Sequence, residues 1–120
     1  MIDDGRTVSA GFGAEVVDLE GIRIVRLRGE LDLSGRPQMQ CLCDRLLAAG
    51  VPTVVLELCE LRFVDGRGVQ GWMELAAQLR NRGGELVLRN PAGIVRRLVE
   101  LTKVGEVARV EYTTDGPSDR

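Results

Sequence analysis

Residues 63–69 (FVDGRGV) interrupt an apolar segment with an acid and two glycines, after which apolar residues recur with helical spacing. Where a strand passes into a helix, the first helical turn exposes unpaired N–H groups and the positive end of the helix dipole, which attract anions. A phosphoryl group on a hydroxyl there would add about −1.5 to −2 of charge to this turn. Asp65 precedes this turn, but Gly66 and Arg67 offer no hydroxyl. The alternative is that Asp65 only caps the helix and Gly66 relaxes the turn.

Glu30, Asp32 and Asp65 are the acids considered for acid–base chemistry. A catalytic pair needs a pocket and groups with separated pKa values, and no partner base is evident in the sequence. The chain contains no histidine, which removes the commonest general base and zinc ligand. Solvated acids beside a binding face are the favoured interpretation. The sequence therefore predicts no catalytic site, no metal site and no cofactor.

The three cysteines, Cys41, Cys43 and Cys59, lack C-x-x-C spacing. Cys41 and Cys43 fall on nearly opposite faces of a predicted helix, so they cannot pair with each other. An odd number of cysteines fits a reducing compartment. Buried or idle thiols are the default interpretation, and a thiol switch through Cys41 is the alternative.

The overall composition indicates one globular domain. The chain has 120 residues, of which 44% are hydrophobic and 28% charged. Its net charge of −2 argues against a sequence-independent hold on nucleic acid and against a basic membrane-surface helix. No apolar run approaches the roughly 18 residues that span a bilayer, which argues against membrane insertion. The acidic start of the chain is unlike a signal peptide, so we expect a cytoplasmic protein.

Strand and helix patterns alternate along the chain, which predicts parallel crossovers with one hairpin at the start. We expect an α/β fold, a mixed β-sheet of four to five strands with α-helices packed against it. The domain should span residues 14–112, with a flexible arm over 1–13 and a flexible tail over 113–120. The expected strands are 14–19, 22–28, 53–58, 85–89 and 107–112.

Three helices should cover this sheet. The first begins near Ser34, as its cap, and ends at Gly50; the second follows Gly68, and the third begins at Asn90 as its cap. The predicted core comprises Leu42, Leu46, Val54, Leu56, Trp72 and Met73. The predicted inner face of the third helix comprises Ile94, Leu98 and Leu101.

Several short motifs in this order resemble the STAS (anti-sigma factor antagonist) family. Gly29-Glu30-Leu31-Asp32 is similar to the G-E-L-D signature of STAS domains, and Asp65 to Gly68 resembles the family's Asp-Ser-Ser/Thr-Gly turn. Residues 82–88 and 95–102 resemble later segments of the family. The resemblance covers roughly residues 16–112.

This resemblance implies a STAS-like fold and a bacterial protein that regulates by binding other proteins. The implied partner is an anti-sigma factor, usually of the GHKL kinase type, or another regulatory protein. The alternatives are a STAS subunit of a transporter complex and a small nucleotide-binding protein; the chain itself would be a monomer or a weak homodimer. The implied partner-binding residues are Gly29, Glu30, Asp32, Asp65, Gly66, Arg67, Gly68 and Val69.

The chain departs from the family at the turn itself. Gly66 stands at the family's usual phosphate-acceptor position, and no Ser, Thr or Tyr occurs from Val54 to Leu101. We therefore predict that phosphorylation at this turn does not control the protein. Glu57 stands where the family often has an aspartate at the end of the central strand, which keeps the charge.

Overall fold

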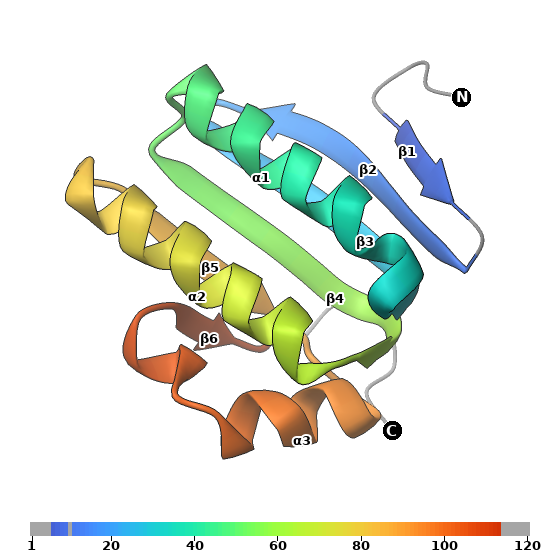
Figure 1. The fold of residues 1–120 in the computed structure, drawn as a ribbon. Helices are drawn as coiled ribbons and strands as arrows, with labels where there is room; N and C mark the ends of the chain where they lie inside the picture. Colours follow the sequence, from blue (N-terminus) through green and yellow to red (C-terminus); the bar gives the residue numbers. More distant parts are fainter. Residues whose placement is uncertain (1–5, 10, 114–120) are drawn as a thin grey trace.

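The computed structural model of the protein describes residues 6–9 and 11–113, which form one sheet with helices against it (Figure 1). The strands are β1 Arg6–Ser9, β2 Phe12–Leu19, β3 Ile22–Leu31, β4 Thr53–Val64, β5 Glu85–Arg89 and β6 Arg109–Glu111. The helices are α1 Arg36–Ala49, α2 Gly66–Asn81 and α3 Gly93–Leu101, with the short 3-10 helices η1 Leu33–Gly35 and η2 Val104–Glu106.

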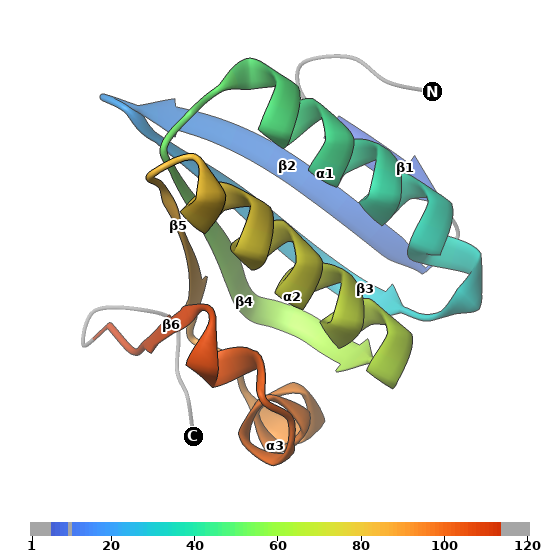
Figure 2. The same cartoon turned by 60° about the vertical axis from the view of Figure 1, so that its left-hand side comes forward.

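The sheet is mixed, and its strands lie side by side in the order of the chain. The pairs β1–β2 and β2–β3 are antiparallel, whereas β3, β4, β5 and β6 run parallel to one another. Helices α1 and α2 lie together across one face of the sheet, and α3 sits apart from them (Figures 1 and 2). The α/β fold class is therefore confirmed.

The sheet has six strands, one more than the upper end of the predicted range. The described part of the predicted flexible arm contains strands: β1 pairs with β2, and β2 begins at Phe12. An edge strand is held mainly by backbone hydrogen bonds and needs few apolar side chains. The polar composition of this segment therefore gave no pattern from which β1 could be predicted. Residues 1–5, residue 10 and residues 114–120 of the predicted arm and tail lie outside the described residues.

The core lies between the sheet and helices α1 and α2. Trp72 and Leu56 are completely buried, and Val54, Leu42 and Leu46 join them. Met73 is only partly buried and packs against this core. The predicted core is confirmed except at Met73, which is less buried than expected.

Strand β4 has twelve residues and continues to Val64, although the alternating pattern predicted an end at residue 58. The buried residues Leu58, Leu61 and Val64 follow one another at intervals of three. Register shifts against β3 cause this spacing, because each bulge adds a residue and moves the next side chain to the other face. Glu57 consequently lies inside the strand and not at its end.

The predicted start of the third helix is wrong. Asn90 has a positive φ of 58°, and Ala92 is the residue before the first turn of α3. The Asn90 side chain is occupied with Glu57 and Thr113. The predicted inner face is also wrong in part, because Ile94 and Leu101 are 54% and 75% exposed, whereas Val95 and Val99 are buried.

Glu57 is the only charged residue among the described part of the chain that is buried, at 8% exposure. Its carboxylate accepts hydrogen bonds from Arg89 Nε at 2.8 Å and from Asn90 Nδ2 at 3.2 Å. The side chain therefore ties β4 to β5 and to the chain that follows it.

Replacing Glu57 with alanine should destabilise the fold by about 2 kcal/mol, because it leaves the Arg89 guanidinium without its closest partner. The matched control is Glu85→Ala, which removes an exposed pair with Arg109 and should cost less than about 1 kcal/mol. Urea unfolding monitored by Trp72 fluorescence compares the two variants. Equal losses would contradict the structural role of the buried pair.

Candidate functional site

The two segments singled out from the sequence, residues 29–32 and 65–68, lie side by side at one end of the sheet; we call them the turn surface. Parallel strands β3 and β4 place Leu31 opposite Val64, and the next residue of each strand begins a turn into a helix. The Asp65 backbone N–H donates to the carbonyl oxygen of Leu31 at 3.3 Å. Helices α1 and α2 start from this same end (Figures 1 and 2). The structure thus brings both predicted segments together.

Asp65 organises the turn surface. Its Oδ1 accepts the Gly68 backbone N–H at 2.8 Å and caps α2, while its Oδ2 accepts a hydrogen bond from Arg36 Nη2 at 3.2 Å. One carboxylate therefore satisfies the first turn of α2 and holds the start of α1. The sequence analysis missed Arg36, because only the three-dimensional arrangement brings residue 36 to residue 65.

Asp32 plays a similar capping role one strand away. Its Oδ1 accepts hydrogen bonds from the hydroxyl of Ser34 at 2.9 Å and from the backbone N–H of Ser34 at 3.1 Å. These bonds hold the pKa of Asp32 below its ordinary value, the hydroxyl contributing most. The prediction that Ser34 caps the first helix is wrong, since Asp32 caps η1 and Gly35 precedes α1.

The three glycines of the turn surface differ in whether the structure leaves room for a side chain. Gly29 has a φ of +86°, and a Cβ there would overlap the backbone of Gly11. A Cβ on Gly68 would lie 2.6 Å from the Val64 side chain, so α2 can begin this close to β4 only without a side chain. Nothing lies within 4 Å of a Cβ on Gly66.

The remaining predicted contact residues divide into exposed and buried groups. Glu30 is exposed and faces Arg62 at 3.9 Å. Gly66 and Arg67 are exposed at the start of α2, and Arg67 makes no hydrogen bond or ion pair in the part of the chain that the structure describes. Val69 is only 1% exposed and its side chain packs into the core, so only its backbone is near the surface; its role in partner binding stays a prediction.

Leu33 belongs to the exposed group, although the sequence analysis did not select it. It follows Asp32 directly and is 71% exposed, which places a large apolar side chain in solvent next to the turn surface. A single apolar residue within the polar segment 32–37 was the available signal.

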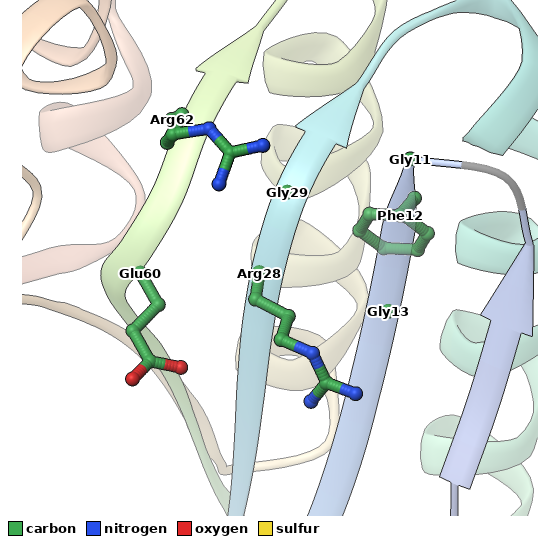
Figure 3. Close-up of a pocket in the computed structure, with 7 residues that line it drawn as sticks. All are labelled: Gly11, Phe12, Gly13, Arg28, Gly29, Glu60 and Arg62. Atoms are coloured by element: carbon green, nitrogen blue, oxygen red, sulfur yellow. The ribbon is translucent and has the colours of Figure 1, made fainter.

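A depression of about 570 Å³ lies beside the turn surface, lined by Gly11, Phe12, Gly13, Arg28, Gly29, Glu60 and Arg62. Figure 3 shows the guanidinium groups of Arg28 and Arg62 directed across β3 and β2, with the helices behind the strands. Glu60 lines the same depression, and Glu30 faces Arg62 at 3.9 Å. Because two carboxylates balance two guanidinium groups, the depression offers no net positive charge to a nucleotide's phosphates.

The thiols differ strongly in their surroundings. Burial is the main cause that raises the pKa of Cys43 to about 12 and the pKa of Cys59 to about 11, so both stay protonated at neutral pH. Cys41 is exposed on α1. A thiol switch at Cys41 stays a prediction.

The fold and the turn surface define a small α/β domain built around two strand-to-helix turns. The chain matches the family described as "Mlab, STAS domain" over residues 15–110, so it belongs to the STAS family. Within the described residues, no helix is long and apolar enough to span a membrane.

Solved structures of similar fold include two anti-sigma factor antagonists. The protein from Mycobacterium paratuberculosis has a TM-score of 0.78 and 21% identity, with 91% of this chain and 92% of that chain covered. SpoIIAA in its unphosphorylated form has a TM-score of 0.73 and 22% identity, with 85% and 89% covered. The murine anion transporter Slc26a9 has a TM-score of 0.60 and 19% identity, over 79% of this chain and 16% of the transporter.

Serine substitutions at the two turn glycines should separate their roles. Gly66→Ser should change stability by less than about 0.5 kcal/mol, because the new side chain enters open space. Gly68→Ser should cost about 1–3 kcal/mol, because its Cβ meets the Val64 side chain. Urea unfolding of both variants measures the difference. A Gly66→Ser variant as unstable as Gly68→Ser would contradict the observed packing.

Proposed function

We propose that this protein is a binding module that docks its turn surface onto an anti-sigma factor in the cytoplasm and thereby influences sigma-factor-dependent transcription. The observation that carries the proposal is the pair of adjacent strand-to-helix turns, fixed by Asp65 and open to solvent at Gly66 and Arg67. The likeness to two anti-sigma factor antagonists over most of both chains supports the choice of partner.

The chemistry of the turn surface supports binding without catalysis. Asp65 already accepts hydrogen bonds from Gly68 and Arg36, and Asp32 from Ser34. These carboxylates are committed to holding helix starts, so they are poorly placed to exchange protons with a substrate. A rigid, preorganised surface of this kind lowers the entropic cost of docking to a partner.

A transporter subunit is the second candidate function. It is favoured by the structural likeness to one part of the Slc26a9 anion transporter. Purification of the tagged chain from its native cells, with mass spectrometry of the co-eluting proteins, distinguishes the two. An anti-sigma factor at stoichiometric amount supports the proposal, whereas a transporter ATPase overturns it in favour of the second candidate.

Arg67→Glu should weaken the complex with the co-purified partner about 30-fold, because it reverses the charge at the centre of the proposed contact. The free protein should keep its stability or gain up to about 1 kcal/mol, since an acid in the first turn of α2 suits the helix dipole. The matched control is Arg45→Glu on α1, which is also exposed and, in the described structure, without a bonded partner. Calorimetric titration and thermal unfolding measure both properties. A change in affinity within about twofold would show that Arg67 lies outside the contact.

Incubation with ATP and the kinase-type partner should add no phosphate that alters binding. Gly66 offers no acceptor oxygen, and the span from Val54 to Leu101 contains no hydroxyl side chain. Intact-mass analysis before and after incubation is the measurement. Phosphorylation of Ser34 or Thr102 that abolished binding would overturn the prediction. Gly66→Ser is the informative variant, and it should gain one phosphate if the kinase still recognises the turn.

A further inference from the structure

The turn surface contains more acidic than basic residues, yet most of its acids are already paired within the chain. Asp65 is bonded to Arg36 and Gly68, and Asp32 to Ser34. Glu30 has Arg62 at 3.9 Å. The negative charges that the sequence suggests for a partner contact are therefore largely neutralised before any partner arrives.

Two exposed side chains remain uncommitted at this surface. Leu33 is 71% exposed, and Arg67 is exposed with no hydrogen bond or ion pair among the described residues. They follow the opposed residues Leu31 and Val64 by two and three positions. Because Leu31 and Val64 are paired and the Asp65 N–H bonds to the Leu31 carbonyl oxygen, Leu33 and Arg67 belong to segments that leave the same end of the sheet from adjacent strands.

The position of Arg67 is also unfavourable for the stability of the folded protein. It is the second residue of α2, where the helix dipole favours an acid and disfavours a cation. Leu33 likewise gains little from burial at its present exposure. Neither side chain is explained by the stability of the described fold, whereas apolar residues and arginine are common anchors of protein interfaces.

We propose that Leu33 and Arg67 form a two-point anchor whose occupant is a folded regulatory protein with an apolar pocket bordered by carboxylates. The inference rests on the proposed function and adds the chemistry of the partner's patch. Leu33 fills the pocket, and Arg67 pairs with a carboxylate at its border, in the bidentate geometry that guanidinium groups favour. The acid-rich sequence of the turn surface suggests a partner with a basic patch, whereas this anchor requires a partner with an acidic one.

The first experiment uses the partner that co-purifies with the full-length chain. Leu33→Ala and Leu33→Asp should each reduce affinity at least about 30-fold while keeping the unfolding midpoint within about 3 °C. Leu19→Asp is the matched control, because Leu19 is 55% exposed but lies at the end of β2, beside Ile22 at the start of β3 and about 30 Å from the turn surface. Loss of affinity by the two Leu33 variants but not by Leu19→Asp supports the anchor; equal affinity of Leu33→Asp and Leu19→Asp overturns it.

The second experiment locates the contact directly. A photo-crosslinking benzoylphenylalanine at position 33 should form a covalent adduct with the partner, whereas the same group at position 19 should not. Replacing the carboxylate nearest the mapped adduct with arginine should restore at least tenfold of the affinity lost in Arg67→Glu. Adducts from position 19 only, or no rescue by any bordering carboxylate, would overturn the inference. Absence of any partner for the unaltered chain would instead refute the proposed function, so the two failures are distinguishable.

Discussion

The arrangement of the turn surface depends on one carboxylate. Asp65 accepts the Gly68 N–H and the Arg36 guanidinium, which joins the first turns of α1 and α2 across the ends of β3 and β4. The parallel pairing of Leu31 with Val64 sets the distance over which this bridge acts. Without it, the first turn of α2 would lack its cap and the two helix starts would lose a direct link.

This constraint explains why the two glycines of the second turn, and likewise its neighbouring acids, have different structural roles. Gly68 lies under Asp65 and against Val64, so packing dictates the absence of a side chain. Gly66, two residues earlier, meets open space, and nothing in the described packing requires glycine there. The acids follow the same division. Asp32 and Asp65 bond to helix starts, whereas Glu30, Leu33 and Arg67 extend into solvent beside them.

The sequence predicts the fold class and most of the core, because helices α1 and α2 and strands β3 and β5 carry clear periodic patterns. It fails where backbone geometry overrides the pattern. Bulges in β4 change the spacing of buried residues to three, which hid its last six residues. In α3 the later start brings Val95 and Val99 inward, so the apolar residues Ile94 and Leu101 lie in solvent.

The site was predicted less completely than the fold, for a physical reason. Short motifs identify Asp65 and Asp32, since capping chemistry is local, and the structure places both at helix starts. Arg36 carries no local signal, because its role comes from a contact across 29 residues. Leu33 carries only a weak one, a single apolar residue in a polar segment, because its role comes from its exposure. Val69 adjoins the turn in sequence, but its side chain is buried in the core. Contact surfaces therefore follow the direction of side chains more than their distance along the chain.

The replacement of a hydroxyl by Gly66 and Arg67 changes the electrostatics of α2 in a definite direction. A phosphate at a helix N-terminus is stabilised by the dipole and by free N–H groups, so modification there would strengthen a negative surface. Arg67 puts a positive charge at the same end, where the dipole opposes it and no described residue neutralises it. An unbound Arg67 is therefore the less favourable state, and a partner's carboxylate would relieve it. This difference favours the bound state without any covalent switch, which matches a binder whose activity follows its concentration.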